Sequence, residues 1–314
     1  MGDEKTLVGE LVKGAGELAP PVETAFLKAL WHLLGGVAAL PAGWIRRRAQ
    51  ATEDITNARS AVSAILAKGV AENALSDPLV MKAAAEIFLP VAIRKSQNLV
   101  AVAELAAGHV AEVAGSAKDP APPDTDWMNK FTRYAEDASS EQLQDLFARI
   151  LAGEVVRPGS FAPATLRTVA ELDKAIAEDF SLMWARDVGG AINHGHEFDR
   201  GEWFSRWKRL VEGGLMASDT TLQHPPEQQI SGLPFRTWSP MMQGSTFVVV
   251  YVPPEARPAW QHISFTRVGR ELGSILARPN YEDNMRTAGA TLGIRSGLKV
   301  ELFVDGKRIE QLTP

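Results

Sequence analysis

The sequence predicts a mainly α-helical protein, with helical hairpins and a helical core followed by a small C-terminal α/β domain that is winged-helix-like. Apolar residues recur at helical spacing through long, alanine-rich stretches of the first two thirds of the chain. The last third alone contains an apolar β-branched run, TFVVVYV at residues 246–252, which is typical of a buried strand. Residues 298–312 add a hairpin, closed by a turn at Asp305-Gly306.

Composition excludes some kinds of chemistry and divides the chain into three segments. The 314 residues include no cysteine, which excludes thiolate zinc fingers, iron–sulfur centres, disulfide scaffolds and cysteine nucleophiles. A net charge of −5 does not suggest a generally basic nucleic-acid coat. Charge and a proline-rich linker near residue 118 predict domains at 1–118 (net 0), 119–193 (net −6) and 194–314 (net +1).

The first segment contains an apolar stretch at residues 25–45, followed by three arginines. Its length is close to the roughly 20 residues that span a bilayer, but it includes a lysine, a histidine and a proline. Three interpretations remain open: a helical hairpin in the core of an oligomer, a helix on a membrane surface, or a true span. In each, the predicted membrane or partner contacts are Trp31, Trp44, Arg46, Arg47 and Arg48.

The rest of the first segment reads as packed helical hairpins. Residues 46–75 contain almost no helix breakers, Asp77-Pro78 can begin a second helix, and residues 91–113 form a third. Their many small residues allow helices to approach closely. We therefore expect this segment, from residue 1 to 118, to be a possible membrane or self-association element.

The middle segment carries the clearest local signals. Asp126 can cap a helix, and Ser139 with Gln142 has the spacing of a capping box before the next one. Two further helices are predicted at 165–172 and 173–188. We interpret this segment as an acidic helical domain held together by packing and capping.

These residues also carry a family likeness. The elements are Asp126-Trp127, the block LFARILAGEVVRPGSFAPATL that ends at Leu166, and the later sequence Phe265-Thr-Arg-Val-Gly-Arg-Glu-Leu272. Together they resemble the bacterial family known as domain of unknown function 2806. The family supplies no activity to transfer, so the resemblance implies a fold and a bacterial source. Its signature residues, interpreted as structural, are Asp126, Trp127, Gln144, Arg149, Gly153, Glu154 and Pro158. We expect the Arg149 guanidinium to hold helix-end carbonyls or Glu154.

The last segment predicts a short helix at 202–212, the strand at 246–252, a helix at 265–277 and the C-terminal hairpin. The short helix places tryptophans on one side and clustered cations on another. The possible nucleic-acid contacts are therefore Arg206, Lys208 and Arg209. Glutamates at both ends of the helix argue against this interpretation.

No catalytic residue and no cofactor are predicted. The only cluster that resembles metal ligands is His194 and His196 with the nearby Glu197 and Asp199, in what also reads as an ordinary interdomain loop. Serine-hydrolase and P-loop spacings are missing from the sequence. An enzyme is therefore the less favoured interpretation.

The sequence thus favours a non-enzymatic bacterial interaction or effector protein. It would be cytoplasmic, with membrane association as the alternative. It would self-associate, bind another protein or contact membrane through its N-terminal helices, as in stress or phage defence. One alternative is a DNA-binding regulator that uses the winged-helix-like domain. The other is a metal-dependent hydrolase at the His194 loop.

Overall fold

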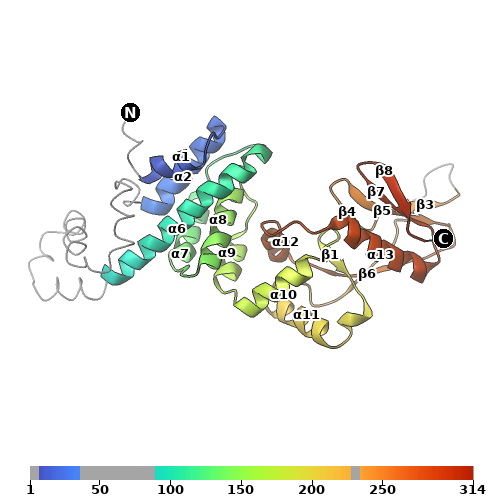
Figure 1. Cartoon of the computed structure of the whole chain (residues 1–314). Helices are drawn as coiled ribbons and strands as arrows, with labels where there is room; N and C mark the ends of the chain where they lie inside the picture. The colour runs from blue at the N-terminus through green and yellow to red at the C-terminus, as the bar shows by residue number, and fades with distance from the viewer. Residues whose placement is uncertain (1–6, 36–88, 228–233, 314) are drawn as a thin grey trace, which may run out of the picture. The chain divides into compact units, whose positions relative to one another are not determined.

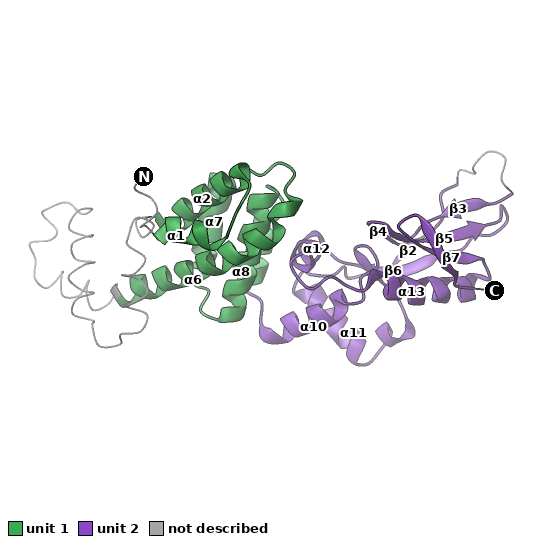
Figure 2. Ribbon diagram, turned by 45° about the horizontal axis from the view of Figure 1, so that its top comes forward, with its two compact units in different colours: residues 1–170 green, residues 171–314 purple. Residues whose placement is uncertain are grey.

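The computed structural model describes residues 7–35, 89–227 and 234–313 (Figure 1). The chain divides into two compact units, residues 1–170 and residues 171–314, which we call the N-terminal and the C-terminal unit (Figure 2). Trp44, Arg46, Arg47, Arg48 and the helices predicted between residues 46 and 88 lie outside the described residues. The three predicted domain boundaries are a different division from these two units, and they stay a prediction.

The described part of the N-terminal unit is entirely helical. Its elements are α1 (Leu7–Gly14), α2 (Pro20–Leu34), α6 (Leu89–Val113), the short 3₁₀ helix η4 (Ala114–Ser116), α7 (Thr125–Ala135), α8 (Glu141–Val156) and α9 (Pro163–Ala170). Helix α6 packs against α1, α2, α7 and α8 and lies at the centre of the unit (Figure 1). Its small residues Ala103 and Ala106 are fully buried, which lets the neighbouring helices approach closely.

Helix α2 holds the described half of the apolar stretch predicted at residues 25–45. Phe26, Leu30 and Leu33 on this helix are almost completely buried within the N-terminal unit. Trp31 is half-buried, and the ring of His32 lies 3.1 Å from the amide oxygen of Asn129 on α7. In this half of the stretch, therefore, the apolar face packs against protein.

Two helix caps differ by one or two residues from the prediction. The carboxylate of Asp124 accepts the backbone N–H groups of Asp126 and Trp127, so Asp126 lies inside the first turn of α7. The hydroxyl of Ser140 accepts the N–H of Leu143 at the start of α8. Neighbouring polar residues offer equivalent caps in the sequence, and the direction in which the chain enters each helix selects one of them.

The C-terminal unit contains both helices and strands. It begins with α10 (Lys174–Trp184), β1 (Ala191–Asn193), the 3₁₀ helix η5 (His196–Phe198), α11 (Glu202–Glu212) and β2 (Thr221–Gln223). There follow β3 (Arg236–Trp238), β4 (Met242–Gln243), β5 (Thr246–Val252), β6 (Trp260–Ser264), α12 (Arg267–Gly273), α13 (Tyr281–Ser296), β7 (Val300–Val304) and β8 (Lys307–Gln311).

These strands form two antiparallel sheets. One has the order β1-β6-β2, and the other has the order β3-β5-β7-β8 with β4 paired to β5. Helix α13 lies against the second sheet (Figure 2), where Met285 and Leu292 pack on Val248, Val250 and other buried residues. The hairpin predicted at 298–312 is present as β7 and β8, with Asp305 and Gly306 at positive φ in its turn.

The predicted fold class is therefore wrong. The protein is mixed α/β rather than mainly α with a small winged-helix-like end, because the part that the structure describes contains eight strands in two antiparallel sheets. Four of these strands, β1 to β4, are only two or three residues long. Strands this short show no alternation that periodicity could detect, and they exist because β5 and β6 provide partners for them.

Candidate functional site

A glycine loop after α10 organises the candidate site. The carboxylate of Asp187 accepts the backbone N–H groups of Gly189 and Gly190, at 3.2 and 2.6 Å. Both glycines have positive φ, and a Cβ on Gly189 would collide with the backbone carbonyl of Met242 in β4. Only glycine fits at position 189, because the loop lies directly on the backbone of β4.

Helix α13 holds the other side of this loop. The amide nitrogen of Asn284 donates to the carbonyl oxygens of Ala185 and Asp187, at 2.7 and 3.0 Å. The hydroxyl of Tyr281, in the first turn of α13, donates to the Asp187 carboxylate. The loop is thereby fixed between α10, β4 and α13.

Burial shifts the pKa values of both Asp187 and Tyr281. It raises the pKa of Asp187, an effect that the N–H groups of Gly190 and Gly189 and the Tyr281 hydroxyl oppose. Burial, together with the charge of Asp187, raises the pKa of Tyr281 to about 12. Tyr281 therefore keeps its proton at neutral pH and remains a hydrogen-bond donor to the carboxylate.

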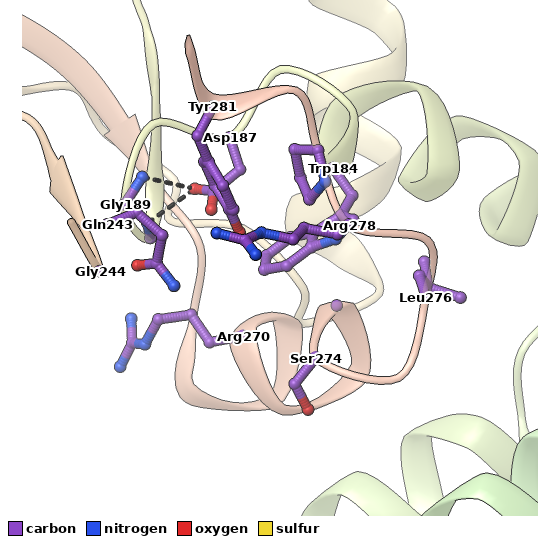
Figure 3. Close-up of a pocket in the computed structure, with 13 residues that line it drawn as sticks. Trp184, Asp187, Gly189, Gln243, Gly244, Arg270, Ser274, Leu276, Arg278 and Tyr281 are labelled. Carbon is purple, nitrogen blue, oxygen red and sulfur yellow. Dashed lines mark hydrogen bonds between the residues drawn. The ribbon is translucent and has the colours of Figure 1, made fainter. Parts of the chain in front are cut away.

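A pocket of about 430 Å³ opens beside the loop (Figure 3). All of its lining residues belong to the C-terminal unit. They come from the end of α10, the glycine loop, β4 with the turn after it, α12, the segment that joins α12 to α13, and the start of α13. The volume lies in the range of about 300–1,000 Å³ that is usual for small-molecule sites.

Two arginines line this pocket. Arg270 donates to the carbonyl oxygen of Phe265 at 2.6 Å, and its aliphatic stem lies against Gly190. The guanidinium of Arg278 lies 5.5 Å from the centre of the Tyr281 ring. Among the described residues, neither guanidinium forms an ion pair with a carboxylate, whereas Arg267 on α12 and Arg286 on α13 do.

The predicted nucleic-acid contacts are already paired within the protein. Arg206 and Arg209 on α11 both contact the buried carboxylate of Asp179 on α10, at 3.2 and 2.6 Å, and Arg206 also pairs with Glu202. The ammonium of Lys208 lies 4.3 Å from the centre of the Trp207 ring. The two contacts with Asp179 join α10 to α11, and they partly neutralise the positive charge of Arg206 and Arg209.

The two histidines proposed as metal ligands share one carboxylate. His194 is buried and its Nε2 lies 3.6 Å from Asp199, whereas His196 is exposed and its Nδ1 lies 3.3 Å from the same residue. Glu197 instead pairs with Arg186, at 3.1 Å. Within the described ranges, no group of three or more histidines, aspartates or glutamates has a metal-binding arrangement.

The family-signature residues of the middle segment meet at the turn between α8 and α9. The buried carboxylate of Glu154 accepts the N–H groups of Gly159 and Phe161, at 2.6 and 3.0 Å. The indole N–H of Trp127 donates to the carbonyl oxygen of Phe161 at 2.7 Å. Gly153 lies against the Phe161 ring. Glu154, Trp127 and Gly153 together fix the turn.

Of the remaining signature residues, Gln144 and Arg149 lie earlier on α8, and only Pro158 lies in this turn. Gln144 donates to the carbonyl oxygen of Ala138 at 2.9 Å, and Pro158 is exposed in the turn itself. Arg149 pairs with Asp145 one helical turn earlier, at 2.8 Å, rather than with Glu154 or with helix-end carbonyls as expected. The structural interpretation of the block agrees with these contacts.

Comparison with known proteins finds one family model that matches part of the chain. Residues 88–188, about a third of the chain, match the model of a family described as protein of unknown function (DUF2806), which confirms the predicted resemblance. The match runs from α6 to α10 and ends inside the Asp187 loop. No curated protein and no solved structure matches the chain.

The sequence analysis missed the residues that form the pocket. Asp187, Tyr281, Arg270 and Arg278 come from separate segments, and no spacing in the sequence joins them. The available signal was the Gly189-Gly190 pair two residues after an aspartate, which is typical of a tight loop closed by the carboxylate. That signal predicts a turn, but it does not predict a pocket.

Gly153→Ala tests the packing of the family turn. Alanine is the better helix former by about 1 kcal/mol, but its Cβ would lie 2.8 Å from the buried Phe161 ring. We expect the free energy of unfolding to fall by roughly 1–3 kcal/mol in urea denaturation, the usual cost of overpacking. The matched control is Gly108→Ala, at an open position on α6, which should stabilise the protein by about 0.5–1 kcal/mol. Stabilisation by both substitutions would contradict the proposed contact.

Asp187→Asn tests the buried carboxylate through pH. The raised pKa of Asp187 means that the folded state holds its proton more tightly than the unfolded state. Its contribution to stability is therefore present below the ordinary value of 3.8 and is lost as pH rises through the raised pKa. We expect the difference in free energy of unfolding, wild type minus Asp187→Asn, to decrease over this window in urea titrations. The exposed Asp219→Asn control should show no such slope, and a difference that rises with pH would contradict the burial argument.

Proposed function

We propose that the protein is a non-enzymatic binding protein whose C-terminal unit recognises an anionic small molecule. The observation that carries this proposal is the pair of guanidinium groups, on Arg270 and Arg278, that line a pocket of ligand size without a carboxylate partner among the described residues. A guanidinium presents several N–H donors in a plane and matches the oxygens of a carboxylate or a phosphate.

The other polar groups of the pocket suit this role. Gln243 and Ser274 contribute neutral side chains that can hydrogen-bond to an oxyanion, and the glycine loop keeps the backbone close to the cavity. In Figure 3, Gln243, Gly244 and Arg270 lie on one side of the pocket, and the guanidinium of Arg278 extends toward them beside Tyr281. Donors from three elements therefore converge on one region.

Asp187 is the acidic group of this pocket, and its surroundings favour a structural role. Its side chain is 1% exposed and is engaged by Gly189, Gly190 and Tyr281. The pocket therefore presents more positive than negative charge to a ligand, because its two guanidinium groups are exposed and the burial of its one carboxylate disfavours the charged form. A carboxylate engaged in this way positions the loop, which supports binding over acid–base catalysis.

Substitution of the two arginines tests the proposal. We expect Arg270→Gln and Arg278→Gln each to weaken the binding of phosphate or carboxylate ligands by about tenfold or more, because a hydrogen bond to a charged group contributes roughly 1.5–3 kcal/mol. Isothermal titration of the full-length protein would measure this effect. Binding should also weaken as salt is raised.

The matched control is Arg295→Gln, an exposed arginine in the last turn of α13 that does not line the pocket. It should leave the affinity unchanged. Equal losses in all three variants, or binding that does not respond to salt, would contradict recognition of an anion in the pocket.

A second proposal concerns the N-terminal unit. We infer that this unit self-associates through apolar side chains on α6, a role also proposed from the sequence. One helix in the described ranges, residues 90–116, is long and apolar enough to cross a membrane by length and composition, and part of it is buried in the unit. Val91, Leu105 and Val113 remain 41%, 38% and 36% exposed on it, which leaves apolar surface for another copy.

Replacing these three residues tests self-association. The triple substitution Val91→Ser, Leu105→Ser and Val113→Ser should shift the full-length protein toward the monomer in sedimentation velocity, because it removes apolar area from the contact. The control Ile294→Ser replaces a side chain that is 76% exposed on α13 and should not change the sedimentation. Self-association would be contradicted if the wild-type protein is a monomer at all concentrations. It would also be contradicted if the wild type floats with liposomes and the triple substitution abolishes this flotation.

A further inference from the structure

The pocket of the C-terminal unit is polar on one side and apolar on the other. Figure 3 shows Trp184 and Leu276 on the side opposite Gln243 and Arg270. Pro279 also lines the cavity. A bare oxyanion would contact only the side with the guanidinium groups. The lining therefore fits a ligand with two parts, an anionic group and an apolar body.

The size of the pocket supports the same conclusion. Small-molecule sites enclose most of a ligand's surface in about 300–1,000 Å³, and this cavity of about 430 Å³ lies in that range. An inorganic phosphate or a carboxylate group alone would leave most of the cavity to water. The apolar residues would then contribute no free energy of binding, because they favour binding only when the ligand removes their surface from water.

The apolar wall is held rigidly by aromatic packing. Trp184 is 7% exposed and packs against Phe180 and Phe265, with ring centres 6.2 and 5.1 Å apart. Phe180 and Phe265 also contact each other edge to face, at 5.9 Å. Three mutually packed rings, two from α10 and one that directly follows β6, fix the orientation of the indole. A preformed aromatic wall of this kind favours a rigid aromatic ligand.

The Arg278 guanidinium and the indole nitrogen of Trp184 both suit an aromatic ligand. Tyr281 and the Arg278 guanidinium already lie close together, and guanidinium groups stack on aromatic faces. The indole nitrogen of Trp184 is buried and has no hydrogen-bond partner among the described residues. A buried donor without an acceptor costs roughly 1–3 kcal/mol, and a ring that carries an acceptor would reduce this cost if the pocket adjusts around it.

We propose that the pocket binds an aromatic or heteroaromatic oxyanion of about mononucleotide size. The oxyanion lies between Arg270 and Arg278, and the ring lies against Trp184, Leu276 and Pro279. This inference rests on the proposed function, because it specifies the ligand of the same site. A phosphate ester and an aromatic carboxylate share the required chemistry.

The test compares defined ligands on the full-length protein by isothermal titration. The probes are inorganic phosphate, phenyl phosphate, hexyl phosphate, benzoate, adenosine and adenosine monophosphate. We expect phenyl phosphate or adenosine monophosphate to bind at least tenfold more tightly than inorganic phosphate. Tighter binding of benzoate than of phenyl phosphate would identify the oxyanion as a carboxylate, and the reverse order would identify it as a phosphate.

A substitution at the apolar wall separates the two parts of the ligand. Leu276→Asn should weaken the binding of aromatic oxyanions by about tenfold and leave inorganic phosphate unchanged, because Leu276 is half-exposed and contacts only the ring. The matched control is Leu222→Asn on β2, a leucine that is 59% exposed and does not line the pocket. The control should have no effect on either ligand.

The outcomes distinguish this inference from the proposed function. Inorganic phosphate binding as tightly as the aromatic esters would overturn the two-part ligand and leave anion recognition standing. Hexyl phosphate binding as tightly as phenyl phosphate would overturn the aromatic ring alone. Adenosine binding as tightly as adenosine monophosphate, or binding by none of the anions, would overturn the proposed function itself.

Discussion

The Asp187 carboxylate is the contact on which the C-terminal unit depends most. It closes the loop after α10 through Gly189 and Gly190, and it accepts the hydroxyl of Tyr281 at the start of α13. The helix and the loop come from opposite ends of the unit, nearly a hundred residues apart in the sequence. A buried carboxylate can link them because three donors compensate the loss of water around its oxygens. The pocket exists because these segments are held together.

The family-matched segment uses the same device twice. Glu154 closes the turn after α8 by accepting two backbone N–H groups, and Asp187 closes the loop after α10 in the same way. In both places a helix ends, the chain reverses, and a buried carboxylate satisfies N–H groups that would otherwise lack an acceptor. The first turn is internal to the helical unit. The second presents a glycine loop to the pocket of the C-terminal unit.

Much of the helical unit could be predicted from the sequence. The helical periodicity of α6 and α8, the stop at Pro158-Gly159 and the structural role of Glu154 all follow from local patterns, because a helix satisfies its hydrogen bonds within one segment. The caps at Asp124 and Ser140 could not be chosen over their neighbours, since each choice depends on the path of the preceding chain. The pairing of Arg149 with Asp145 was missed because several acceptors were within its reach.

The sequence by itself determined helices such as α6, α8 and α11, the long strand β5, the β7–β8 hairpin and the absence of thiol chemistry, but it did not predict α1 or α13. Only the tertiary structure decided the class of the fold, because strands such as β1 and β4 form where a neighbouring strand offers hydrogen bonds. It also decided the candidate site. The pocket is formed by segments distant in the chain, so Arg270 and Arg278 line the same cavity only after α10, β4 and α13 pack around the Asp187 loop.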